Sequence, residues 1–293
     1  MKKGDYVFKK FLSGLVFGAG FGIAFVIVAV VFIMFFFKPM VERRFASSDQ
    51  VIESPPSIQA PQKFLGTSAV YSSDFKDNKE GVLSKGPGKI VGQALVNNNP
   101  VPGLKLRLPL NGRVVSQWAT TDEKGRYAIS VPYGEYRIDG YELDSTTANR
   151  VLAGKIAHPQ FPHSSDNFDV TKDSNGRGLV LRFVDPIKKK IPKKTFSESE
   201  SVVINWAPYP GAHQYTIQVY EKTEPYSFTG GDTLFEWGDL PKTSDASLDL
   251  GKHEVKLRPG HFYVVNIVAL DDRMAPISET DRKHSGYDFE ITE

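Results

Sequence analysis

The chain has 293 residues, a formal net charge of +2 and no cysteine. The absence of thiols excludes disulfides, cysteine-ligated zinc and thiol nucleophiles, and the low net charge argues against nucleic acid as a partner. Two domains of about 100 residues each are large enough to be stabilised by their cores alone.

The first element is an apolar run at residues 11–37 that contains no acid, base or proline. A bilayer core requires about 20 apolar residues, so we predict a single transmembrane helix at 11–37 behind a cytoplasmic tail at 1–10. The alternative is a cleaved signal peptide, whose apolar region spans about 7 to 15 residues and ends at a small-x-small site. This run ends instead in Phe-Phe-Phe-Lys-Pro at residues 35–39.

The orientation of the predicted helix depends on a narrow difference in flanking charge, because positive residues favour the cytoplasmic side. The basic residues before it and after it are Lys2, Lys3, Lys9 and Lys10, and then Lys38, Arg43 and Arg44. The short segment before the helix and the long segment after it favour the same orientation. We expect an inner (cytoplasmic) membrane protein with a cytoplasmic N-terminus, a periplasmic or extracellular body, and the lipid bilayer as a partner.

Three glycines in this run recur at every fourth position, namely Gly14, Gly18 and Gly22. Such glycines share one helix face and allow two backbones to approach closely. This spacing predicts a homodimer formed through the helix. The alternative is that glycine is simply common in membrane helices.

Residues 38–87 are rich in Ser, Pro, Gln, Asp and Lys, and their apolar residues occur singly. A segment of this composition buries too little apolar surface to fold as a domain, so we predict an extended stalk. Two short apolar pairs near its end, Phe64-Leu65 and Val70-Tyr71, are candidates to join the following domain as an edge strand.

Residues 88–186 show short segments in which apolar and polar residues alternate, separated by turns. One example is Leu104, Leu106 and Leu108, and the segment Asp-Glu-Lys-Gly at 122–125 predicts a hairpin turn. Several short strands at this spacing are typical of a β-sandwich. The strand expected at 179–183 would complete this domain near residue 186.

The sequence blocks at 90–93, 100–104, 121–127 and 131–136 resemble the carboxypeptidase regulatory-like family, which has a transthyretin-like (prealbumin-like) sandwich. The resemblance implies a non-catalytic module that sits beside enzymes, receptors or adhesins, and the family's zinc peptidase domain has no counterpart here. The positions that carry the resemblance and are expected to be structural are Gly92, Pro102, Gly103, Asp122, Gly125, Gly134 and Tyr136.

Five lysines surround Pro192 in residues 187–196, which we interpret as a solvated linker between two domains. The alternative is a basic contact with anionic lipid or acidic polysaccharide.

Residues 197–293 again predict short strands, and they resemble a fibronectin type III or related immunoglobulin-like domain. The resemblance depends on Trp206 in an early strand and on the motif Leu257, Pro259, Gly260 and Tyr263. In the family, the tyrosine of this motif forms a corner in which its hydroxyl bonds back to the backbone. The stretch 226–249 is longer than the family pattern and departs from it.

The sequence shows little that indicates catalysis. His158 and His163 have a spacing compatible with metal binding but lie in a proline-containing loop, and Asp169, Asp173 and Asn175 are better explained by a tight turn than by a calcium loop. No nucleophile-elbow motif Gly-x-Ser-x-Gly is present. We therefore expect no catalytic residue, no metal and no cofactor.

These features predict an all-β protein with two tandem β-sandwich domains behind one transmembrane helix. The expected function is non-enzymatic: the chain would present two interaction domains in the cell envelope, as a scaffold or in adhesion, to an unidentified envelope protein. The alternative is a polysaccharide-binding module in which Trp118, Trp237 or nearby tyrosines stack on sugars. An undetected hydrolase is a distant third.

Overall fold

The computed structural model describes residues 62–72, 75–76, 80–160, 166–227, 231–253, 255–281 and 286–293. All of them belong to one compact unit, Gln59–Glu293. The predicted tail, the helix at 11–37 with its glycines Gly14, Gly18 and Gly22, and the stalk up to residue 61 lie outside these residues. Within the described ranges, no helix is both long and apolar enough to cross a bilayer.

The fold is almost entirely β, and its strands pack around two hydrophobic cores. We call residues 62–186 the first sandwich and residues 187–293 the second sandwich. The strands of the first sandwich are β1 (Ala69–Tyr71), β2 (Gly81–Val82), β3 (Gly88–Val96), β4 (Asn99–Pro100), β5 (Lys105–Arg107), β6 (Pro109–Leu110), β7 (Val114–Val115), β8 (Ala119–Thr120), β9 (Arg126–Val131), β10 (Gly134–Tyr136), β11 (Gly140–Leu143), β12 (Ile156–Ala157), β13 (Phe168–Val170) and β14 (Gly176–Val184).

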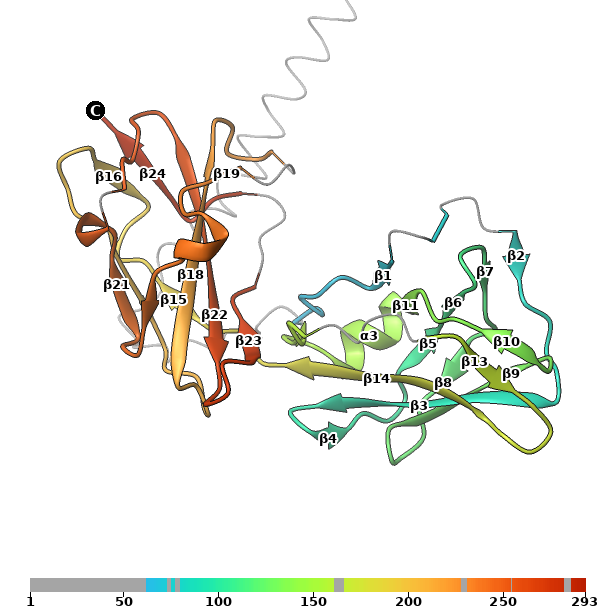
Figure 1. Cartoon of the computed structure of the whole chain (residues 1–293). Helices are drawn as coiled ribbons and strands as arrows, with labels where there is room; N and C mark the ends of the chain where they lie inside the picture. Colours follow the sequence, from blue (N-terminus) through green and yellow to red (C-terminus); the bar gives the residue numbers. More distant parts are fainter. Residues whose placement is uncertain are drawn as a thin grey trace, which may run out of the picture. The chain divides into compact units, whose positions relative to one another are not determined.

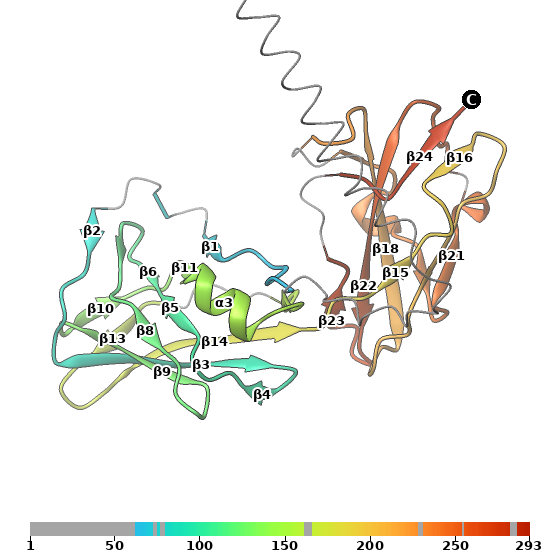
Figure 2. The same ribbon diagram turned by 180° about the vertical axis from the view of Figure 1, so that it is seen from behind.

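Two sheets form the main layers of the first sandwich. One has the order β12-β14-β3-β4, with β9 also paired to β3, and the other has the order β1-β11-β5-β8. The two longest strands, β3 and β14, run parallel and side by side (Figures 1 and 2). Because side chains alternate across a strand, Ile90 and Ala94 of β3 face the core, where they join Leu104 and Leu106 from the other sheet.

One helix, α3 (Ser145–Val151), follows β11 and was not expected from the strand-like sequence pattern. Asp144 caps it, because its Oδ1 accepts a hydrogen bond from the backbone N–H of Thr147 at 3.0 Å. Ala148 of the helix is buried in the first core.

The first sandwich begins earlier than predicted, because the last part of the expected stalk is folded into it. Phe64 belongs to the core and packs edge-on against Phe183. Strand β1 pairs with β11 at the edge of its sheet, with Val70 opposite Tyr141. The prediction of an edge strand is therefore confirmed for Val70-Tyr71, whereas Phe64-Leu65 joins the domain outside any strand. The stalk boundary at 87 is too late.

The second sandwich contains β15 (Lys189–Lys190), β16 (Thr195–Ser197), β17 (Val203–Trp206), β18 (Gln214–Lys222), β19 (Asp232–Thr233), β20 (Lys242–Thr243), β21 (Ser247–Asp249), β22 (Phe262–Leu270), β23 (Pro276–Glu279) and β24 (Phe289–Thr292), with short 3-10 turns η2 (Trp237–Asp239) and η3 (Leu250–Lys252). One sheet has the order β15-β17-β21. The other has the order β16-β24-β22-β18-β19, with β20 on β18 and β23 on β22.

The segment predicted as a lysine-rich linker, residues 187–196, is part of the second sandwich. It supplies β15 and the start of β16, and both Ile187 and Phe196 lie in the second core. The high lysine content of the segment masked these two apolar residues, and their burial fixes the segment in the second sandwich. The linker interpretation is therefore corrected to two edge strands.

Candidate functional site

The glycine predicted at position 92 is required by close packing. A Cβ atom there would lie 2.4 Å from the carbonyl oxygen of Leu179 and from the ring of Tyr127. The Tyr127 hydroxyl donates to that same carbonyl at 2.9 Å. Gly92 thus allows β14 and a buried tyrosine to approach β3.

The predicted turn at 122–125 forms, but it does not close a hairpin. The Oδ1 atom of Asp122 accepts hydrogen bonds from the backbone N–H groups of Lys124 and Arg126 at 2.9 and 2.8 Å, and Gly125 has a φ of +68°, which favours glycine. Strand β8 before the turn pairs with β5, whereas β9 after it pairs with β3. The turn therefore carries the chain from one sheet to the other.

The remaining predicted positions of the first sandwich lie in turns or in the short strand β10. Pro102 is exposed, and the N–H of Gly103, at a φ of +74°, donates to the carbonyl of Thr121 at 3.0 Å. Gly134 begins β10, and the hydroxyl of buried Tyr136 donates to the carbonyl of Pro132 at 2.9 Å. These residues hold turns in place and do not line a common site.

In the second sandwich, Trp206 is buried and packs edge-on against Tyr215. The hydroxyl of Tyr263 accepts a hydrogen bond from the backbone N–H of Arg258 at 2.7 Å, which is the geometry predicted for the corner. Around it, Leu257 packs against the core, Pro259 is half-buried and Gly260 has a φ of +77°.

The corner also contains an ionisable partner that the sequence pattern did not reveal. The Tyr263 hydroxyl donates to Oε1 of buried Glu221 at 2.7 Å. The pKa of Tyr263 is raised, chiefly by burial and further by the Glu221 carboxylate. Both sides of this contact are in neighbouring strands, because Glu221 of β18 is paired directly with Tyr263 of β22.

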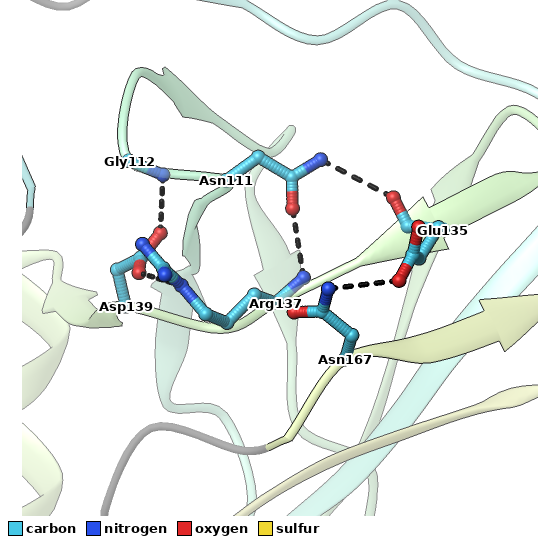
Figure 3. A network of polar contacts seen from close by, with 6 residues as sticks. All are labelled: Asn111, Gly112, Glu135, Arg137, Asp139 and Asn167. Carbon is cyan, nitrogen blue, oxygen red and sulfur yellow. Dashed lines mark hydrogen bonds and ion pairs between the residues drawn. The ribbon is translucent and has the colours of Figure 1, made fainter.

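A polar network lies where the β6–β7 turn of the first sandwich meets β10 and β13 (Figure 3). Asn111 has a φ of +52°, and its Nδ2 donates to the carbonyl of Glu135 at 3.2 Å while its Oδ1 accepts from the N–H of Arg137 at 2.7 Å. The Nδ2 atom of Asn167 donates to Oε1 of Glu135 at 2.8 Å. The amide and carboxylate groups of this network are thus fixed by hydrogen bonds.

Asp139 is the buried member of the network and binds both Arg137 and the turn at Gly112. Its side chain is 0% exposed, its Oδ1 accepts from Nε of Arg137 at 2.8 Å, and its Oδ2 accepts from the N–H of Gly112 at 2.6 Å. A buried carboxylate with both oxygens satisfied costs little to keep charged.

The network borders a pocket of about 290 Å³, which is lined by Asn111, Arg113, Glu135, Arg137 and Asn167. All five are polar, whereas pockets for drug-like ligands are mostly apolar. Asparagine and arginine side chains in fixed positions form directional hydrogen bonds to carboxylate, hydroxyl or amide groups. The pocket is therefore suited to a polar group of a partner.

A second polar row crosses the outer face of the β1-β11-β5-β8 sheet. The Tyr71 hydroxyl donates to Oε1 of Glu142 at 2.6 Å, and Nε of Arg107 donates to Oε2 of Glu142 at 2.6 Å. The guanidinium of Arg107 and the ammonium of Lys105 lie 4.7 and 5.2 Å from the centre of the Trp118 ring. Trp118 is 39% exposed, so this row places a cation-covered aromatic ring at the surface.

The residues weighed for metal binding do not come together within the described chain. His158 is half-buried and its Nδ1 accepts from the N–H of Gln160 at 3.1 Å, whereas His163 lies outside the described residues. Asp173 lies in a turn after β13, as predicted. The described residues contain no group of three His, Asp or Glu side chains that would hold a metal ion. Trp237, weighed above for sugar stacking, lies in η2, and its side chain is not among those that the structure describes.

Sequence reasoning missed the pocket because its residues come from three separate turns and strands. One local signal was present: Asn-Gly at 111–112 favours a tight turn with positive φ. Nothing local connects that turn with Asn167, which follows in the chain after the helix and β12.

No family model matches this chain, and no curated protein matches it. Among solved structures it is similar to a DUF3823 family protein from Parabacteroides merdae (11% identity, 68% of this chain and 98% of that one, TM-score 0.21) and to another from Bacteroides ovatus (10%, 67% and 96%, 0.21). It is also similar to the Bacillus anthracis TIE protein (14%, 70% and 33%, 0.24). At these TM-scores the likeness supports no argument about fold or function.

Proposed function

We propose that this chain is a non-enzymatic, single-pass envelope protein that presents two β-sandwich domains to a partner protein. The observation that carries the proposal is the polar pocket beside the network of Figure 3, whose Asn111, Glu135, Arg137 and Asn167 groups are held by hydrogen bonds before any partner arrives. Such preorganisation lowers the ordering cost of binding. Its buried carboxylate, Asp139, is satisfied by two donors and covered from solvent, which suits a structural role better than proton transfer.

The experiment is photo-crosslinking in the native membrane, with a photoreactive amino acid at Arg113 on the pocket rim. We expect one discrete adduct, identified by mass spectrometry, that is lost when Asn111→Ala removes two of the pocket's hydrogen bonds. The matched control places the same group at Lys172, an exposed residue outside the pocket. Equal adducts from both positions would refute the pocket as the binding site.

The domain families remain part of the proposal. The corner at Tyr263, buried Trp206 and the sheets β15-β17-β21 and β16-β24-β22-β18 support a fibronectin type III or immunoglobulin-like second sandwich. The close packing at Gly92 and the sheet-crossing turn at Asp122 support a carboxypeptidase regulatory-like first sandwich.

The membrane anchor is also proposed from the apolar run at 11–37. We expect the full chain to resist alkaline extraction from membranes, and external protease to digest the body only after the outer barrier is opened. A mature N-terminus beyond residue 39 would contradict the anchor. If the helix dimerises, Gly18→Ile weakens the dimer in detergent, because the larger side chain separates the two backbones.

A polysaccharide is the second candidate partner, and one observation favours it. Tyr71 and Trp118 are partly exposed at two ends of the same outer row, as in a stacking platform. Trp118→Ala would then reduce retention on envelope polysaccharide by about tenfold, since aromatic stacking contributes about 1 to 3 kcal/mol in comparable ring contacts. Unchanged retention would leave the protein partner as the better proposal.

A further inference from the structure

The outer face of the β14-β3-β9 sheet is open to solvent and carries an unusual set of side chains. Its apolar centre is Val91 and Val180, which are 39% and 37% exposed. Residues directly opposite each other across paired strands point to the same side. The exposed cations placed on this face by the strand register are Lys89, Arg126, Arg177 and Arg182. We call these six residues the arginine face.

The cations of the arginine face have no carboxylate partner within the described chain. Elsewhere in the first sandwich, the other arginines do have partners: Arg107 pairs with Glu142, Arg113 with Glu80 and Arg137 with Asp139, and Arg150 contacts the carbonyl of Gly103. On the face, Arg182 contacts only the amide oxygen of Asn98, at 3.1 Å. Unpaired arginines around exposed valines match the composition of protein interfaces, in which arginine is enriched.

The second sandwich contains a segment with the opposite character. Between Lys222 and Lys242 the chain has four acidic residues and no basic one: Glu224, Asp232, Glu236 and Asp239. All four are exposed, and within the described residues none forms an ion pair. Beside them Tyr226 is 73% exposed, more than any other large apolar side chain of the described chain. We call the described residues 223–227 and 231–241 the acidic hairpin.

Topology places the acidic hairpin far from the chain's own connection between the sandwiches. The carbonyl of Asp185, in that connection, accepts a hydrogen bond from the hydroxyl of Ser278 in β23. Strand β23 pairs with the last residues of β22, and these lie opposite Gln214, the first residue of β18. The connection is therefore near the start of β18. The acidic hairpin follows Lys222 at the other end of β18. A strand of nine residues spans about 30 Å, so a neighbouring copy is better placed than the same chain.

We propose that the acidic hairpin of one copy docks on the arginine face of another copy, with Tyr226 over Val91 and Val180 and the carboxylates beside the arginines. The two surfaces are different, so the contact is heterologous and extends into rows of molecules unless the rotation closes a ring. Arginine forms bidentate contacts with carboxylates, which gives such a contact direction as well as attraction. The proposal is independent of the polar pocket beside Asn111 and Asn167.

The test is sedimentation of the full chain in detergent, with Gly18→Ile present throughout to remove any helix contact. We expect concentration-dependent association that weakens when ionic strength rises from about 0.05 to 0.5 M, because screening acts on exposed charges. Arg177→Glu with Arg182→Glu should weaken association at least about tenfold. Glu224→Lys with Asp232→Lys should do the same.

Mixing the two charge-reversed chains decides whether these surfaces meet. Each variant alone repels its own copies at this contact. In the mixture, the untouched acidic hairpin of the first variant meets the untouched arginine face of the second, and the new lysines of the second meet the new carboxylates of the first. The mixture should therefore regain association, as should one chain with all four changes. The matched control is Lys124→Glu with Lys172→Glu, two exposed lysines off the face, which should associate like the parent. A monomeric parent, or a four-fold variant without recovery, overturns the proposal.

Discussion

The two sandwiches have the same layered architecture but opposite charge. Residues 62–186 contain 16 basic and 13 acidic residues, a net +3, whereas residues 187–293 contain 13 basic and 17 acidic residues, a net −4. The small net charge of the whole chain conceals this difference. Averaged composition is therefore a poor guide to partners when domains differ.

They also differ in where they keep their charges. The first sandwich buries Asp139 and Glu142 beside surface arginines. The second buries Glu221 at the tyrosine corner. It also buries Asp288, which forms an ion pair with half-buried Lys189, and this lysine also donates to the carbonyl of Val265 at 2.6 Å. Stability of the second sandwich should depend more on buried polar partners, and that of the first on close backbone packing.

The largest effect is expected from breaking the buried ion pair of the second sandwich. Lys189→Met should cost about 3 to 5 kcal/mol of unfolding free energy, because it leaves the buried carboxylate of Asp288 without this partner. Denaturant unfolding of the full chain measures it. The control is Lys190→Met at the exposed neighbour, and equal stability of both variants would contradict the role of the pair.

In the first sandwich, the largest effect is expected at Gly92. Gly92→Ala should destabilise it by about 2 to 3 kcal/mol, because the added methyl overlaps the Leu179 carbonyl and the Tyr127 ring. Gly238→Ala in the second sandwich meets no atom within 4 Å and serves as the matched control. An unchanged unfolding midpoint for Gly92→Ala would contradict this prediction, because it would show that β14 can shift away from β3 without a cost in stability.

Tyr127 in the first sandwich and Tyr263 in the second are both buried, and their hydroxyl groups have different numbers of partners. Tyr263→Phe should cost about 1 to 3 kcal/mol, because it leaves the N–H of Arg258 and the carboxylate of Glu221 without the hydroxyl. Tyr127→Phe removes one hydrogen bond, to the Leu179 carbonyl, and should cost about 1 kcal/mol. Thermal melting of both variants measures the difference, and the reverse order would contradict it.

The smallest effect concerns pH. Burial holds the pKa of His158 below its usual value, and the charge of Arg182 lowers it further. The folded state then binds fewer protons than the unfolded chain, so this contribution is present above about pH 6.5 and is lost as pH falls toward the folded pKa. His158→Gln should therefore lose less stability between pH 7 and about pH 5.5 than the parent. His213→Gln, at an exposed histidine, is the control in denaturant titrations.

Much of the β architecture could be predicted from residues that define local geometry. Alternation predicted the buried side of Leu104, Leu106 and Leu108, and the motif around Gly260 predicted the tyrosine corner. Pairing was harder to predict: the turn at Asp122 was recognised, but its two flanking strands belong to different sheets. A turn fixes local direction, whereas the partner of a strand is chosen by burial of distant apolar faces.

By itself, the sequence determined the strand-forming segments, the tight turns and the apolar run at 11–37, because these depend on side chains close together in the chain. Only the tertiary structure decided that Phe64, β1 and residues 187–196 belong to the folded sandwiches, that Asp139 is buried, and that Asn111 and Asn167 share a pocket. These outcomes depend on contacts between residues far apart in the chain, whose energies no local pattern records.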